Sequence, residues 1–314
     1  MLFMSLLLLP LSALTARHTT FVVAGGTPDM LPAISPLFSF NTTVEWGLSR
    51  HLPYVQNHLA VLKAGVMPLS CIKEARDFNL DPSDFEVYKV TYRDCDRPWY
   101  FCRHKSAKID GRNMRIAFGR FPVAMRELVK HIIVLKGSDM PGLAGKNILD
   151  TIVIADNYFK LYIFAHEIAH SIDRHIPVPG VNLTFQGGLS LSPKWQDEVN
   201  KDKATPTEYA RRNWSENLAE AGVVALFDMV VPGGLKTVNA NYRDYETFRA
   251  YYGDIIQPRK KLKCTNRVPD SPLVNLNDMS NVVTPADDTK LGVDITMDSG
   301  EDFENATYVL PVSL

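Results

Sequence analysis

Cysteine is scarce in this chain, which has four in 314 residues. A small fold held together mainly by disulfides is therefore excluded. Neither sign of charge is in excess, because 34 Lys and Arg stand against 35 Asp and Glu. We therefore expect no nucleic-acid partner and no polybasic membrane anchor. Hydrophobic residues make up 46% of the chain, which is enough to build a substantial core.

The sequence also lacks an apolar run near the ~20 residues that a membrane-spanning helix needs. The apolar run from Leu2 to Leu9 is shorter and is followed by the small residues Ala13 and Ala16. This pattern is typical of a secretory signal peptide, although no Lys or Arg precedes the run. We expect residues 1–16 to be the signal peptide, with cleavage near Ala16, and the protein to be secreted and extracellular.

Four Asn-x-Ser/Thr triplets agree with export. Asn41, Asn182 and Asn305 are predicted glycosylation sites, whereas Asn213 is predicted to cap a helix and to remain unmodified. The prediction rests on the triplets alone, which also occur by chance.

An even number of cysteines in an oxidising compartment predicts two disulfides, for which three pairings are possible. The short interval between Cys95 and Cys102 favours a local loop closed by that pair. Cys71 and Cys264 would then join the beginning of the core to its end.

The pattern of residue types divides the chain into an arm, a core and a tail. Residues 17–54 are expected to form an irregular N-terminal arm, residues 55–264 the main folded domain and residues 265–314 an acidic, disordered or loosely attached tail. Within the core, alternating β-formers predict a strand at Phe85–Tyr92, and a β-branched run predicts a buried strand at Thr151–Ala155. Apolar residues at helical spacing predict helices over residues 123–132, 157–175 and 213–229. The fold class is therefore expected to be α+β. Residues 176–208, between the last two predicted helices, are expected to form an irregular segment that leaves the core.

One motif carries chemistry, His166-Glu167-Ile168-Ala169-His170. Residues four apart are offset by about 40° around a helix, so the two imidazoles face the same way. Two neutral imidazoles on one face can hold Zn²⁺, and Glu167 lies beside the first of them, where a general base is needed. The alternative is a pair of histidines at the edge of the core, bonded to backbone groups, with Glu167 in solvent.

A zinc site of this kind needs a third ligand. His175 is excluded, because it lies nine residues after His166 and so about 180° away around the helix. We favour Glu216, with Glu220 one turn later on a second helix. Glu220 could accept a hydrogen bond from the far nitrogen of a ligating histidine. The alternative for Glu216 is a capping box with Asn213.

Residues Tyr209 to Ala221 contain a Tyr, an Arg two residues later, an Asn four later and a Glu seven later, followed by Ala-Glu-Ala. This segment resembles the second active-site segment of gluzincin metallopeptidases of the anthrax lethal factor type. The helix from His166 to Asp173 resembles the first segment of that family. Over its whole length, the chain resembles secreted fungal conidiation-specific proteins thought to be peptidases, which share the stretch from Asp94 to His104.

The gluzincin resemblance implies a role for each matching residue. The zinc ligands would be His166, His170 and Glu216, with Glu167 as base, Tyr209 as a phenol near the oxyanion and Glu220 beside the ligands. From the residues alone, Tyr209 could equally be a structural tyrosine before the helix. Asp173 lies two turns after His166 and is expected to support the site, the alternative being an ion pair with Arg174 or another base.

We therefore expect a secreted, monomeric zinc metallopeptidase that acts on peptide or protein substrates. Its zincin-like domain would place a small sheet near the HExxH helix, with the Glu-bearing helix packed across it. Two alternatives remain: a secreted zinc-binding protein of development or of the cell wall with little or no proteolysis, and a structural secreted protein without metal.

Overall fold

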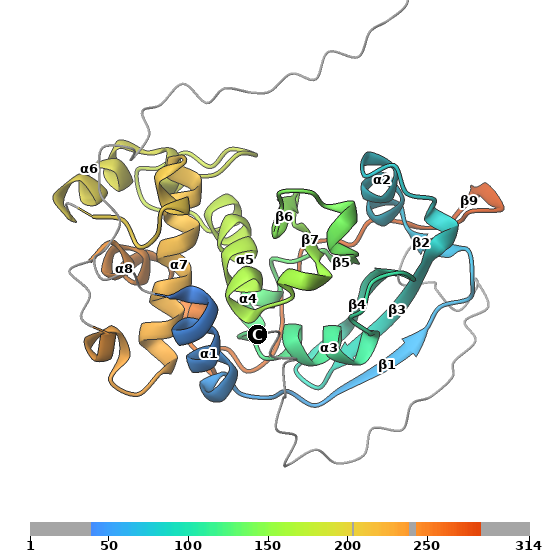
Figure 1. Cartoon of the computed structure of the whole chain (residues 1–314), viewed down its shortest axis with the longest axis horizontal. Helices are drawn as coiled ribbons and strands as arrows, with labels where there is room; N and C mark the ends of the chain where they lie inside the picture. Colours follow the sequence, from blue (N-terminus) through green and yellow to red (C-terminus); the bar gives the residue numbers. More distant parts are fainter. Residues whose placement is uncertain (1–38, 203, 239–242, 284–314) are drawn as a thin grey trace, which may run out of the picture.

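The computed structural model describes residues 39–202, 204–238 and 243–283, so the predicted signal peptide, Asn305 and most of the predicted tail lie outside the described residues. The first part of the described chain mixes strands with helices, four helices then follow one another, and two short strands end it (Figure 1). Their order is α1 (Glu45–His51), β1 (Asn57–Val61), β2 (Val66–Pro68), α2 (Leu69–Asp77), β3 (Phe85–Tyr92), β4 (Cys95–His104), α3 (Gly111–Gly119), α4 (Val123–Arg126), β5 (His131–Leu135), β6 (Gly145–Ile148), β7 (Thr151–Ala155), α5 (Leu161–His175), α6 (Pro193–Asp202), α7 (Trp214–Val230), α8 (Asp244–Ile256), β8 (Leu273–Asn275) and β9 (Asp278–Val283).

A six-stranded mixed sheet organises the fold, in the order β1-β3-β4-β5-β7-β6. The strands β4, β5 and β7 run parallel, whereas β1, β3 and β6 pair antiparallel with their neighbours. Strand β6 is an edge strand and contacts α5, the helix that carries the HExxH motif. The α+β class predicted from the sequence is thus confirmed.

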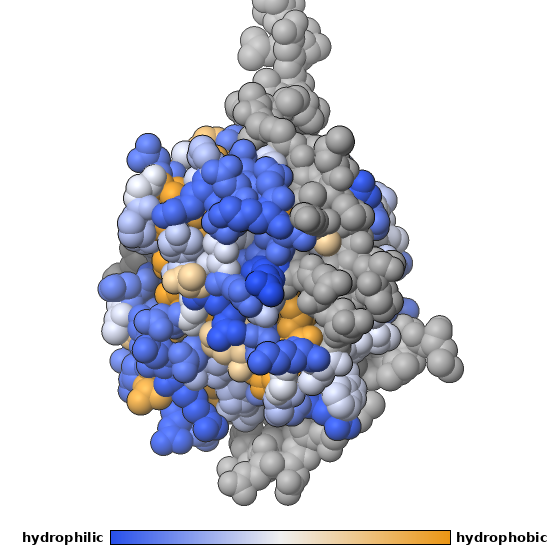
Figure 2. Space-filling model, turned by 90° about the vertical axis from the view of Figure 1, so that its left-hand side faces the viewer, coloured by the Kyte–Doolittle hydropathy of each residue, from blue (hydrophilic) through white to orange (hydrophobic). Residues whose placement is uncertain are grey.

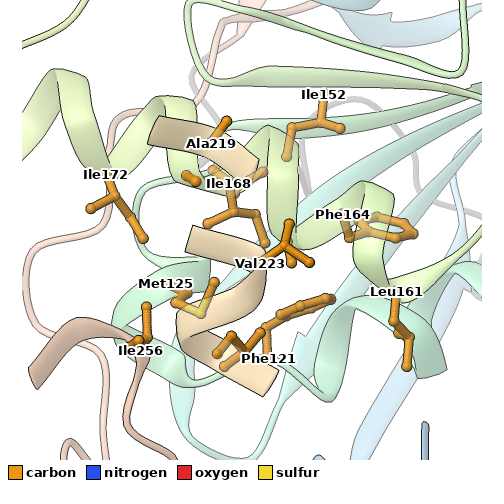
Figure 3. Close-up of a cluster of buried hydrophobic side chains, with 14 of the residues drawn as sticks. Phe121, Met125, Ile152, Leu161, Phe164, Ile168, Ile172, Ala219, Val223 and Ile256 are labelled. Carbon is orange, nitrogen blue, oxygen red and sulfur yellow. The ribbon is translucent and has the colours of Figure 1, made fainter. Parts of the chain in front are cut away.

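The two faces of this sheet are covered by different layers. Alternate strand residues, such as Ile132 and Ile152, face the helices α3, α4, α5 and α7 in the larger hydrophobic core. The residues between them, such as Ile133 and Val153, face α2 and the small sheet of β2, β8 and β9. Figure 3 shows Ile168 of α5 beside Val223 of α7 within the larger core. Burial of apolar side chains from both helices thus holds the two site-bearing helices together.

Several predicted elements are confirmed, and others are wrong. Both predicted strands coincide with β3 and β7. The predicted helix at residues 157–175 contains α5, and the one at residues 213–229 covers α7 except for its last residue, Val230. The predicted helix at residues 123–132 is wrong in its second half, because α4 ends at Arg126 and the β-branched residues from His131 begin β5. The predicted arm is not irregular throughout, since a π-helical turn at Phe40–Val44 leads into α1, whose Leu48 is buried.

The predicted tail begins too early. Residues Leu273–Asn275 form β8, which pairs antiparallel with β2 and with β9, so the chain after Cys264 is attached to the core at least as far as Val283. Leu273 and Val274 are almost fully buried. A three-residue strand is too short to show a clear period, which explains why the sequence pattern missed it.

The predicted disulfide pairing is wrong, although all four cysteines are paired. The bonds are Cys71–Cys102 and Cys95–Cys264. Cys95 and Cys102 lie on the same strand, β4, and seven residues of extended chain separate them by about 23 Å. Their odd spacing also places them on opposite faces of the sheet, Cys95 in the larger core and Cys102 in the smaller.

No helix in the part of the chain that the structure describes is both long and apolar enough to span a bilayer. Figure 2 shows mainly hydrophilic residues on one face of the molecule, with apolar residues scattered among them.

A buried histidine, His131, links the large sheet to the segment before β8. Its Nδ1 lies 3.2 Å from the carbonyl oxygen of Tyr100, and its Nε2 accepts a hydrogen bond from the backbone N–H of Ser271 at 3.2 Å. These partners require a neutral ring with its proton on Nδ1. Burial, together with the charge of Arg267, lowers the pKa of His131 to about 3.

We expect acid to destabilise the fold through His131. Between pH ~6.5, where an unfolded histidine titrates, and the folded-state pKa of about 3, the unfolded chain alone binds the proton, so the free energy of unfolding falls as the pH falls. The loss is about 2 kcal/mol between pH 7 and pH 5. Denaturant titrations of the wild type and of His131→Gln at both pH values measure it. A wild type that loses no more stability than the variant contradicts the prediction.

Candidate metal centre

Helix α5 presents the two imidazoles of the HExxH motif toward α7. His166 is buried, His170 is partly exposed, and their ring centroids are 4.9 Å apart. The predicted helical spacing therefore places both rings on one face. His175, which the spacing excluded, points elsewhere and bonds through its Nε2 to Asp150 at 2.8 Å.

Helix α7 begins beside these rings. Asn213 caps it, accepting a hydrogen bond from the backbone N–H of Glu216 at 2.9 Å. The prediction that Asn213 is a helix cap is therefore confirmed. The Glu216 side chain turns toward the imidazoles, with its Oε2 2.9 Å from the Nε2 of His166 and 3.4 Å from the Nε2 of His170. The cap thus leaves the Glu216 carboxylate available for the site.

Three potential metal ligands therefore meet at one point, the Nε2 atoms of His166 and His170 and a carboxylate oxygen of Glu216. The two Nε2 atoms are 3.2 Å apart. Ligand atoms at ~2.05 Å from a tetrahedral Zn²⁺ lie about 3.3 Å from one another, so the observed separations of 2.9 to 3.4 Å fit that ion. The donor set of two histidines and a glutamate is one that leaves a fourth coordination position open.

The hydrogen bonds of the far ring nitrogens agree with a metal-facing role for the near ones. The Nδ1 of His166 lies 2.8 Å from an oxygen of Glu220, which can accept a hydrogen bond from it. The neutral ring with its proton on Nδ1 has a lone pair on Nε2. The Nδ1 of His170 lies 3.2 Å from the hydroxyl of Ser215. A carboxylate and two imidazole nitrogens then face one another, an arrangement that a cation stabilises.

The cluster changes the proton affinities of its members. Burial alone would lower the pKa of His166. The ring protonated on both nitrogens, however, bonds to Glu216 as well as to Glu220, and these bonds raise that pKa well above the usual value. Burial raises the pKa of Glu167. Burial also opposes ionisation of Glu216, yet its bonds to the two histidines hold its pKa below the usual range. The ligand carboxylate therefore stays ionised, while Glu167 gains affinity for a proton.

Two supporting residues were not predicted from the sequence. The hydroxyl of Thr207 donates to the second oxygen of Glu220 at 2.7 Å, so Glu220 is held from both sides. Ser215 precedes Glu216 on α7 and reaches His170. Thr207 and Ser215 lie close in sequence to Tyr209 and Glu216, and this proximity is the one signal that could have indicated them. No spacing rule distinguishes a Ser or Thr that bonds to a ligand from one on the surface.

Glu167 lies against the edge strand β6. A Cβ atom added at Gly145 would lie 2.5 Å from the Oε1 of Glu167, so glycine leaves room for this carboxylate. The side chain of Asn147 donates to the backbone carbonyl of Glu167 at 2.6 Å and to the Ser171 hydroxyl at 2.9 Å. These bonds fix β6 against α5 beside the candidate base.

Tyr209 stands at the rim of the site. It belongs to a 3₁₀ turn, Tyr209–Arg211, before α7, and its ring centroid is 5.7 Å from that of His166. Burial and the charge of Glu216 raise the pKa of Tyr209 to about 12, so the phenol keeps its proton at neutral pH. The guanidinium of Arg212 lies over the ring.

Asp173 does not support the ligands as the sequence suggested. Its carboxylate accepts hydrogen bonds from the backbone N–H groups of Gly188 and Ser190, each at 3.1 Å, and from the hydroxyl of Tyr252 at 3.3 Å. It therefore anchors the loop after α5. The prediction placed Asp173 on the correct helix but assigned it the wrong partner, because helical spacing does not reveal what packs beside a side chain.

The cluster of His166, His170 and Glu216 lies beside two adjoining cavities. A cavity of about 550 Å³ is lined mainly by apolar residues, among them Phe40, Met140, Tyr158 and Tyr162. A more polar one of about 470 Å³ is lined by Lys146, Asn147, Arg174, Gln186, Ser215 and others. Leu143, Gly145, His166, Glu167 and Tyr209 border both. An elongated ligand could therefore pass the cluster along β6.

The fold and the site define an α+β protein with a candidate metal centre between two helices. A family model described as Conidiation-specific protein Con-13 matches residues 51–242, more than half of the chain. The chain therefore belongs to this family. It is 31% identical over 151 residues to Conidiation-specific protein 13 of Neurospora crassa, a match that spans 48% of this chain and 43% of the relative. The chain thus covers less than half the length of that relative, and no solved structure matches it.

We expect Glu216→Ala to weaken zinc binding by at least about 100-fold. Replacing a residue that only orients a metal ligand already lowers metal affinity by about 10–100-fold. Competition with a coloured chelator measures the affinity. Glu208→Ala is the matched control, because this exposed carboxylate lies nearby but pairs with Arg211. Equal zinc affinity in Glu216→Ala and Glu208→Ala would contradict the assignment.

We expect Gly145→Ala to displace Glu167 while leaving the ligands in place. The added methyl would collide with the Glu167 carboxylate and displace this candidate base. Zinc content should stay at the wild-type level, while hydrolysis of a peptide substrate should fall by about 10-fold or more. Gly142→Ala is the control for a glycine in the same cavity wall, since a Cβ there meets no atom within 4 Å, although its φ of +77° makes some strain unavoidable.

Proposed function

We propose that this chain is a zinc-dependent peptidase of the gluzincin kind with a zincin-like fold. The observation that carries the proposal is the convergence of His166, His170 and Glu216 from two helices, with their three donor atoms 2.9 to 3.4 Å apart. Glu167, the residue that would act as base, adjoins the first ligand and borders both cavities. An antiparallel edge strand beside the HExxH helix supports the zincin-like comparison.

His166, His170 and Glu216 would hold the zinc ion. When bound, Zn²⁺ supplies Lewis acidity, which polarises the scissile carbonyl and makes an attacking water more acidic. Glu167 would take the proton of that water and return it to the leaving amine.

Other residues would orient these groups. Glu220, held by Thr207, fixes the tautomer of His166. Tyr209 keeps its phenolic proton at neutral pH and borders the cavities, so it could donate a hydrogen bond to the developing oxyanion. An extended peptide would lie along β6, adding main-chain hydrogen bonds to a strand edge.

Secretion is part of the proposal. Two disulfides within the described residues are compatible with an oxidising compartment. Asn41 and Asn182 are exposed, which suits glycosylation at these two predicted sites. We further propose that the protein acts as a monomer.

The test replaces the base and leaves the ligands intact. We expect Glu167→Gln to keep one bound zinc while hydrolysis of a casein or peptide-library substrate falls by about 100-fold or more. Zinc content is measured by atomic spectroscopy and hydrolysis by mass spectrometry of the products. Gln keeps the size of Glu but cannot accept the proton.

Three outcomes separate the hypotheses. Wild-type hydrolysis that Glu167→Gln abolishes supports the peptidase. Bound zinc without hydrolysis by the wild type across the library refutes it, and favours a zinc-binding developmental or wall-associated protein. A purified wild type that binds no zinc refutes both and leaves a structural secreted protein.

A further inference from the structure

The helix that carries both imidazoles begins without a cap of its own. Lys160, the residue before α5, makes no side-chain hydrogen bond to the first turn. The first N–H groups of a helix have no partner within it, and a buried helix start needs one from elsewhere. Here the carboxylate of Glu45, 117 residues away in sequence, accepts a hydrogen bond from the backbone N–H of Tyr162 at 3.1 Å.

The hydrogen bond to Tyr162 is the one contact of this kind found for the Glu45 side chain within the described residues. It is 4% exposed, in the first turn of α1. Its Oε1 has no hydrogen-bond partner. A negative side chain at a helix N-terminus is stabilised by the helix dipole as well as by its hydrogen bonds. The hydrogen bond to the start of α5 thus compensates in part for the burial of this carboxylate.

The same short helix packs against α7, which carries Glu216. A Cβ atom added at Gly47 would lie 2.5 Å from the ring of Phe227 and 2.9 Å from the side chain of Val231. The glycine therefore lets α1 approach the C-terminal end of α7 closely. Figure 1 shows α1 beside the end of α7 and near α5, as the contacts among these three helices require.

The segment also reaches the cleft. Phe40, in the turn before α1, packs edge-on against Tyr162 with ring centroids 5.9 Å apart, and both line the apolar cavity. Tyr162 is therefore held by Phe40 through its ring and by Glu45 through its backbone. His166 lies one turn further along α5, so a displacement at Tyr162 is carried directly to the first imidazole.

We propose that α1 is a clamp for the metal centre and that Glu45 is its positioning residue. By fixing the start of α5 while α1 rests on α7, Glu45 holds the imidazoles at the separation from Glu216 that a shared ion requires. This inference rests on the proposed zinc site. It adds a residue outside the family match, which begins at residue 51 and so does not contain Glu45.

The experiment compares Glu45→Ala, Glu45→Gln and Glu127→Ala in the full chain. Glu127 is the matched control, because it is also buried and also accepts backbone N–H groups, those of Thr265 and Asn266, but lies away from the metal cluster. The readouts are zinc affinity by chelator competition, the visible spectrum of the Co²⁺-loaded protein and the free energy of unfolding.

We expect Glu45→Ala to weaken zinc binding about tenfold and to alter the Co²⁺ spectrum, as the loss of an orienting partner does. Glu45→Gln keeps an oxygen acceptor and should retain most of the affinity. Glu127→Ala should lose stability with its zinc affinity unchanged. If Glu45→Ala does not fold, Glu45→Asp carries the test, because its shorter carboxylate should also weaken zinc binding.

A wild type that binds zinc, with Glu45→Ala or Glu45→Asp binding it equally well and with the same Co²⁺ spectrum, overturns the clamp and leaves the zinc site standing. Equal weakening by Glu127→Ala also overturns it, since the effect would then be one of general stability. A wild type without zinc affinity overturns the proposed function and the clamp together.

Discussion

The close packing of α5 on α7 is the constraint on which the candidate site depends. Helix α5 carries His166 and His170, and α7 carries Glu216. The carboxylate can therefore meet the two imidazoles when the two helices pack closely. Gly222 of α7 permits this, because a Cβ atom there would lie 2.9 Å from the Cβ of Ala169 on α5. Ala169 is the residue directly before His170, so this close contact adjoins the candidate ligands. Small residues at a helix crossing thus determine whether the site can form.

The sheet and the helices position different parts of the candidate site. Strand β6 supplies Gly145 and Asn147, which place and hold Glu167, whereas α7 supplies the carboxylates that complete and orient the imidazole pair. The apolar core between sheet and helices fixes these parts relative to one another. The polar groups of the site are consequently bonded from several directions, as buried polar networks must be if they are to be rigid.

Local patterns in the sequence were enough to predict the parts of the site that depend on one helix. The spacing of His166 and His170, the rejection of His175 and the cap at Asn213 all follow from the geometry of a single element. The strands β3 and β7 were also predicted at their observed bounds, because alternation and a β-branched run are local signals. What the sequence did not reveal depends on contacts between distant segments. The disulfide partners, the loop anchored by Asp173, the support from Thr207 and Ser215, and the place of α1 each require knowing which elements pack together.

The bond between Cys95 and Cys264 spans 169 residues of sequence and so encloses every residue of the candidate site in one covalent ring. A protease that cuts the exposed loop around Phe185, which is 65% accessible, would break the backbone between α5 and α7. The disulfide would keep the two resulting fragments joined. The nicked molecule would migrate as one species until it is reduced. A protein built in this way can tolerate surface cleavage close to its candidate site, because the two halves remain tethered.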